Sequence, residues 1–217
     1  MTTLTQEQIN WLNKCTKETY QITKGTWTLN PKTGLVDVEG GFDCSRQRLK
    51  DFKGVKFGVV TGDFYCDNNS LTSLVGAPQE VGESFCCDSN SLTSLVGAPQ
   101  KVGGSFKCSY NRLTSLVEAP QRVGGSFFCN YNLLISLEGA PLDLGGNYWR
   151  LYCSPNPVSQ KTLITMFSKM KKGDSFWVAA TSLKNKMSKK DWELVATNIP
   201  EAIRPGVSML GRFGLFN

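Results

Sequence analysis

The chain has 217 residues, a formal charge of +6, eight cysteines and no histidine. This length is enough for one extended domain or two small ones. The lack of histidine excludes Ser–His and Cys–His nucleophilic pairs and histidine-bound metals, and no stretch is long and apolar enough to span a membrane.

The first 40 residues have the pattern of a cap. Thr5 and Gln8 have the spacing of a capping box, and Ile9 and Leu12 follow on one face of the predicted helix. Two strands are predicted at 26–29 and 35–38, joined by a turn at 30–34. The N-terminus lacks the apolar core of a signal peptide. We therefore expect residues 1–40 to form a helix and a hairpin at one end of the fold.

A repeat of 21 residues follows. The segment NSLTSLVGAP occurs at 69–78 and again at 90–99, and near-copies stand at 111–120 and 132–141. Repeats of this length stack side by side, because no single unit can bury its apolar residues alone.

Four columns of the repeat form its frame. They are phenylalanine (Phe64, Phe85, Phe106, Phe127), cysteine (Cys66, Cys87, Cys108, Cys129), asparagine (Asn69, Asn90, Asn111, Asn132) and leucine (Leu71, Leu92, Leu113, Leu134). The alternation in F-x-C predicts a short strand with phenylalanine and cysteine inside. An inward asparagine can satisfy the backbone groups that a tight turn leaves unpaired.

The pattern F-x-C-x-x-N-x-L-x-x-L resembles the leucine-rich repeat signature, and its proline and 21-residue length look like the short bacterial type. The W-T-L-N-P-x-T-G-L-V-D-V segment at Trp27–Val38 is similar to leucine-rich repeat proteins encoded by tailed bacteriophages. The resemblance implies an α+β fold, a solenoid with a parallel ladder of short strands. We expect the solenoid to cover residues 41–157.

Degenerate units extend the repeat at both ends. Phe42 and Cys44 begin an earlier coil in which Gln47 replaces asparagine, and Leu151 begins a later one with Asn156. Terminal repeats are expected to be atypical, because they close an open core.

Residues 158–217 are predicted to be a small helical region. Helices are expected at 159–173, 175–187 and 188–199. Between 161 and 190 there are eight lysines and one acidic residue, Asp174. These lysines are consistent with an ordinary solvated face, with an acidic protein partner, or with contacts to nucleic-acid phosphates.

Six cysteines occupy the buried frame column, where free cysteine acts as a small apolar residue. This favours an intracellular protein with reduced thiols over a disulfide scaffold. A metal or redox ladder is the alternative, but no second ligand type accompanies the column. Cys86 falls at an outward position, and we expect it to be an exposed, ordinary thiol.

The outward positions of the strands vary while the frame repeats, so packing does not set them. Aromatic and charged side chains in an ordered row are typical of protein-binding hot spots. A terminal segment that folds over this face would be the alternative explanation. The predicted partner-binding residues are Tyr65, Asp67, Cys86, Asp88, Lys107, Tyr110, Phe128, Asn130, Tyr131 and Tyr152.

The predicted function is a non-enzymatic protein-binding module with no catalytic residue, cofactor, metal or membrane contact. The phage resemblance implies that it acts in the host cytoplasm, where it inhibits or redirects a bacterial host protein such as a defence factor through its concave repeat face. The alternative is a nucleic-acid-binding protein that uses the lysine-rich C-terminal helices. An enzyme in the C-terminal 60 residues ranks last.

Overall fold

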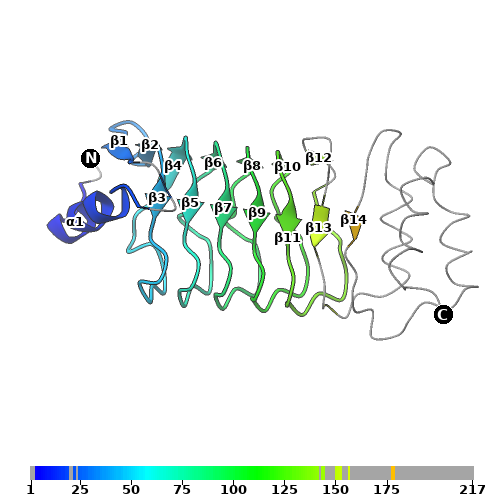
Figure 1. The fold of residues 1–217 in the computed structure, drawn as a ribbon. Coiled ribbons are helices and arrows are strands. Elements are labelled where there is room, and N and C mark those ends of the chain that lie inside the picture. Colours follow the sequence, from blue (N-terminus) through cyan, green and yellow to red (C-terminus); the bar gives the residue numbers. More distant parts are fainter. Residues whose placement is uncertain are drawn as a thin grey trace, which may run out of the picture.

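The computed structural model describes residues 3–19, 22, 24–141, 143–144, 150–152, 156 and 177–178. They form one N-terminal helix and a β-solenoid, in which successive coils lie next to each other along one axis (Figure 1). Strands that pair with one another in neighbouring coils are about 21 residues apart, as the repeat predicts. The solenoid architecture is therefore confirmed.

The helix α1 (Gln6–Cys15) begins at the predicted capping box. The Thr5 side chain accepts a hydrogen bond from the Gln8 backbone, and the Gln8 side chain accepts one from the Thr5 backbone. The helix buries Trp11, Leu12 and Cys15. The Trp11 ring lies edge-on to Phe42 at 5.4 Å between centroids, so α1 closes the N-terminal end of the core.

Each coil contributes strands to two sheets, where the repeat predicts only one ladder. The phenylalanine sheet consists of β3 (Phe42–Asp43), β5 (Phe64–Tyr65), β7 (Phe85–Cys86), β9 (Phe106–Lys107), β11 (Phe127–Phe128), β13 (Arg150–Tyr152) and β14 (Trp177–Val178). The valine sheet consists of β1 (Thr26–Leu29), β2 (Val36–Glu39), β4 (Phe57–Val60), β6 (Glu80–Val81), β8 (Lys101–Val102), β10 (Arg122–Val123) and β12 (Asp143–Leu144). The β1–β2 hairpin is antiparallel, as predicted, and the other pairings of described strands are parallel.

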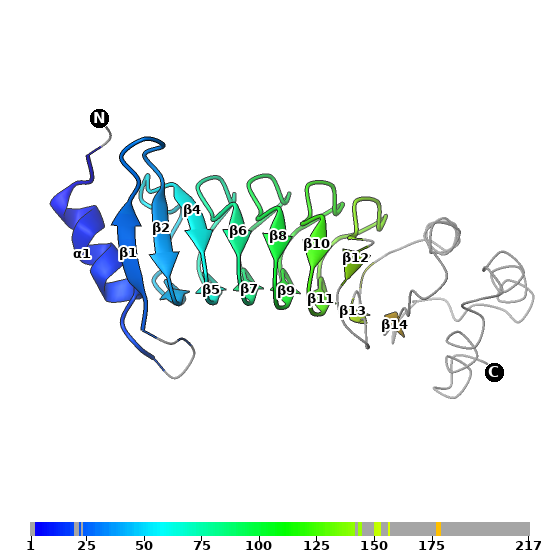
Figure 2. The same cartoon turned by 90° about the horizontal axis from the view of Figure 1, so that it is seen from above.

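The core lies between the two sheets (Figure 2). Its centre is a row of phenylalanine rings from Phe42 to Phe127, fully buried and 5.1 to 5.5 Å apart from one coil to the next. The cysteine and leucine columns are buried beside them. The predicted register, with phenylalanine and cysteine inside, is therefore confirmed.

The asparagine column forms a ladder of hydrogen bonds to the backbone. The Asn111 amide donates to the carbonyl oxygens of Cys87, Cys108 and Ser109, and its Oδ1 accepts from the backbone N–H of Leu92. Each asparagine thus ties its own coil to the one before it. Asn156 continues the ladder by accepting from the Leu134 N–H and donating to the Cys129 carbonyl.

The predicted helix at 175–187 is wrong at its start, because Trp177–Val178 form β14, which pairs in parallel with β13. An aromatic residue and a β-branched residue favour a strand, and β14 pairs an edge that β13 would otherwise expose. The rest of that helix, the helices predicted at 159–173 and 188–199, and the eight lysines lie outside the described residues.

Candidate functional site

The predicted binding residues lie along the outer face of the phenylalanine sheet. The strand register places Tyr65, Cys86, Lys107, Phe128 and Tyr152 next to one another in successive strands. In Figures 1 and 2 the coils follow a nearly straight axis, so we name this face by its sheet rather than as a concave surface.

A left-handed turn follows each of β5, β7, β9 and β11. Its residues are Asn68, Ser89, Tyr110 and Tyr131, with φ between 51° and 55°. This conformation costs a residue other than glycine about 1–2 kcal/mol, and asparagine tolerates it best. Asn68 suits the turn, but a bulky tyrosine does not. The fold therefore gives no reason for tyrosine at this position.

The two tyrosines nevertheless stack on each other in solvent. The Tyr110 and Tyr131 rings are 4.5 Å apart between centroids and nearly parallel, at 11°. Their exposed fractions are 55% and 51%, so no described segment covers them. Large apolar surface that stays open to water in this way marks an interaction site.

Lys107 and Phe128 extend this surface on β9 and β11. The Lys107 ammonium lies 6.0 Å from the centroid of the Phe128 ring, at the limit of a cation–π contact. We call the four residues Lys107, Tyr110, Phe128 and Tyr131 the aromatic patch. It brings together four of the ten predicted binding residues from two neighbouring coils.

Cys86 does not belong to an exposed surface, and its predicted exposure is wrong. Only 7% of the residue is exposed, and burial raises the pKa of its thiol well above the usual range. Its short side chain lies in the row between the longer Tyr65 and Lys107, which explains why it is covered. The exposed, ordinary thiol expected at this position is absent from the face.

Asp67 and Asp88 are also less available than predicted. Asp67 is 7% exposed; its Oδ2 accepts from the Asn68 amide at 2.6 Å, while its Oδ1 has no hydrogen-bond partner among the described residues. Asp88 is half-buried and accepts from the Ser109 backbone N–H at 2.6 Å. Burial raises the pKa of the Asp88 carboxyl. Both carboxylates thus form hydrogen bonds with residues of the turns, and little of either group faces solvent.

The remaining predicted residues lie beside the aromatic patch. Tyr65 is half-buried, and burial raises the pKa of its hydroxyl to about 12, so it stays protonated at neutral pH. Asn130 is half-buried in the coil of Phe128. The backbone of Tyr152 continues the row in β13, and its side chain lies outside the described part of the chain.

The described cysteines give no reactive centre. Cys44, Cys66, Cys87 and Cys108 are fully buried, and burial raises the pKa of each thiol above its usual value. Within the described ranges, no cluster of three or more cysteine, aspartate and glutamate side chains could hold a metal ion. Nor is any helix in this part of the chain long and apolar enough to cross a membrane.

Sequence reasoning missed a second feature, a group of basic residues between α1 and the first coil. Its signal was present in the sequence as five cations between Arg46 and Lys56, at positions where the later coils carry mostly uncharged residues.

Comparison with protein-family models, with curated proteins and with solved structures finds no match for the chain.

Proposed function

We propose that the protein is a non-enzymatic binding module that holds a protein partner on the aromatic patch. The observation that carries the proposal is the exposed Tyr110–Tyr131 stack in a left-handed turn. The stack costs conformational energy and leaves aromatic surface in water, and a bound partner would offset both. Aromatic residues with an adjacent cation are also the typical composition of binding hot spots.

The resemblance to phage-encoded leucine-rich repeat proteins suggests the class of partner. On this proposal the protein acts in the host cytoplasm and binds a bacterial host protein, which it inhibits or redirects. A defence factor is one such target. The aromatic patch, rather than a concave groove, is the contact surface that we propose for it.

The test replaces both tyrosines with the residue that the turn favours. Tyr110→Asn with Tyr131→Asn should fold at least as stably as the wild type, because asparagine adopts the left-handed conformation more easily. The partner is captured from bacterial lysate on the wild-type protein, identified by mass spectrometry and purified. Its affinity for the double variant should fall by roughly thirtyfold or more, which corresponds to about 2 kcal/mol.

The matched control removes similar apolar surface elsewhere. Val96 and Val117 lie in neighbouring coils and are 51% and 48% exposed, but they follow the buried Leu95 and Leu116 and lie outside the aromatic patch. Val96→Asn with Val117→Asn should leave the affinity unchanged. Equal losses in the two double variants, or full affinity in the tyrosine variant, would contradict the proposal.

A further inference from the structure

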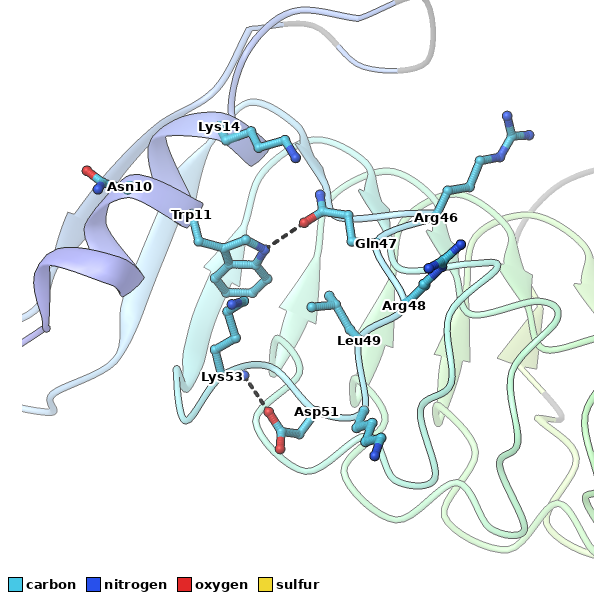
Figure 3. Close-up of a pocket in the computed structure, with 10 residues that line it drawn as sticks. Asn10, Trp11, Lys14, Arg46, Gln47, Arg48, Leu49, Asp51 and Lys53 are labelled. Carbon is cyan, nitrogen blue, oxygen red and sulfur yellow. Dashed lines mark hydrogen bonds between the residues drawn. The ribbon is translucent and has the colours of Figure 1, made fainter.

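We propose that an open pocket between α1 and the first coil binds a small molecule that carries two or three phosphate groups. The pocket has a volume of about 640 Å³, which is within the usual range for small-molecule sites. Lys14 from α1 and the loop 46–53 line it (Figure 3). It lies at the cap end of the stack, away from the aromatic patch, so this inference does not rest on the proposed function.

The pocket is strongly basic. Five cations line it: Lys14, Arg46, Arg48, Lys50 and Lys53. The one acidic lining residue, Asp51, accepts a hydrogen bond from the Lys53 backbone N–H at 2.7 Å, and the Lys53 ammonium pairs with Glu7 outside the lining at 2.7 Å. The other four cations form no ion pair within the described part of the chain.

The repeat frame does not require these cations. The positions of Arg46 and Arg48 correspond to Asn68 and Ser70 in the next coil and to Ser89 and Ser91 in the one after. Both arginines have left-handed backbones, with φ of 56° and 58°. Smaller residues adopt this conformation more easily, and strain of this kind tends to occur at functional sites.

The floor of the pocket is apolar, and its polar groups already have hydrogen-bond partners. It is formed by Trp11 and Leu49, which are buried. The Trp11 Nε1–H donates to the Gln47 Oε1 at 3.1 Å, and the Gln47 amide donates to the Cys15 Sγ at 3.3 Å. Since the polar groups of the floor have partners, the charged side chains around it are the groups left to recognise a ligand.

The chemistry of those side chains selects phosphate. Guanidinium groups bind phosphate oxygens with two parallel hydrogen bonds, and lysine adds a compact charge. In Figure 3 the Lys14 side chain points toward the loop, while Arg46 points outward from the rim. Four cations without an ion-pair partner among the described residues surround a pocket of this size. They match the several negative charges of a diphosphate or triphosphate better than they match the one charge of a carboxylate.

The test measures binding of tripolyphosphate and of ATP to the full chain by calorimetry, at low salt. Arg46→Asn with Arg48→Asn should fold normally, because asparagine suits both left-handed positions. We expect its affinity for both probes to fall at least about tenfold, which is 1.4 kcal/mol. If that variant does not fold, Lys14→Gln on the helix should give a loss in the same direction.

The matched control removes two cations outside the pocket. Arg112 occupies the position of Arg48 three coils further on, and the exposed Lys32 lies in the turn between β1 and β2. Arg112→Asn with Lys32→Asn keeps the same net charge as the loop variant and should bind both probes like the wild type.

Four results would overturn the proposal. They are no binding of either probe, equal losses in the loop and control variants, equal binding of a polyglutamate peptide, and binding of a single-stranded oligonucleotide without binding of tripolyphosphate. The third result would assign the pocket to acidic protein segments, and the fourth would assign it to nucleic acid.

Discussion

At the scale of single residues, the left-handed turns contain two kinds of residue. Some favour this backbone conformation, and others adopt it at an energetic cost. Asn68 was a visible signal for such a turn, because asparagine favours positive φ. The sequence placed Tyr110 and Tyr131 in the same column, and from this their outward position could be predicted. Their strained backbone could not, because φ is set by how the whole coil closes.

A second left-handed column gives a stability prediction. Its residues are Gly76, Gly97, Glu118 and Gly139, with φ of 96°, 87°, 67° and 84°. Glu118→Gly should relieve strain of about 1–2 kcal/mol and lose about 0.5–1 kcal/mol to the greater freedom of glycine in the unfolded chain. We expect a net gain of up to about 1.5 kcal/mol in the free energy of unfolding, measured with urea.

The reverse change in the preceding coil is its control. A Cβ at Gly97 would lie 2.6 Å from backbone atoms of Leu74 and Val75, so Gly97→Glu should destabilise the protein clearly. A loss of stability in the Glu118→Gly variant would show that the Glu118 side chain makes a contact worth more than its backbone strain.

Asp88 gives a prediction about pH. Because burial raises its pKa, the folded protein binds this proton more tightly than the unfolded chain does. The resulting stability is fully present below the unfolded pKa of about 3.9 and is lost as the pH rises through the folded value. Asp88→Asn keeps an acceptor for the Ser109 N–H and carries no charge.

The Asp88→Asn variant should therefore have a higher melting temperature than the wild type at pH 7, and the difference should shrink as the pH falls toward about 4. Lys107 opposes the shift and Asp67 adds to it, so both are left unchanged in this comparison. A difference that does not vary with pH would show that the charge of Asp88 is not its cause.

At the scale of secondary structure, the elements that could be predicted are those whose pattern is contained in a few consecutive residues. The F-x-C alternation gave the phenylalanine sheet, and the capping box gave α1. The valine sheet was missed because each of β6, β8 and β10 carries a single inward residue, so no apolar alternation marks the strand as phenylalanine and cysteine do in F-x-C. The inward Val102 lies between the exposed Lys101 and Gly103, a pattern equally typical of a turn.

The first coil shows why a degenerate repeat was only partly predictable. Gln47 was expected to take over the role of asparagine, but its longer side chain reaches α1 and contacts Trp11 and Cys15 instead. The Asn69 side chain accepts hydrogen bonds from the backbone N–H groups of Gln47 and Leu49. The contacts that attach α1 to the first coil join residues more than 30 positions apart in the sequence, so no local pattern predicts them.

At the scale of the whole molecule, the solenoid is a chain of neighbour contacts. Ring stacking, the asparagine ladder and the strand pairings each join one coil to the next. In such an array, stability is the sum of coil and interface contributions, so damage at one interface stays local at first. The position of a substitution along the stack should therefore matter as much as its chemistry.

Hydrogen exchange can test this with two substitutions. Asn111→Ala leaves the Leu92 N–H without its partner, which costs about 1–3 kcal/mol if this buried group finds no water, while the carbonyls of Cys87 and Cys108 keep hydrogen bonds from Asn90 and Asn132. Protection should fall most in the coils at 85–105 and 106–126. Gln47→Ala should instead release α1 and the coil at 42–63, and leave the central coils protected. Uniform loss of protection in both variants would mean that the described coils open as one cooperative unit, and that the contacts between coils are stronger than the coils themselves.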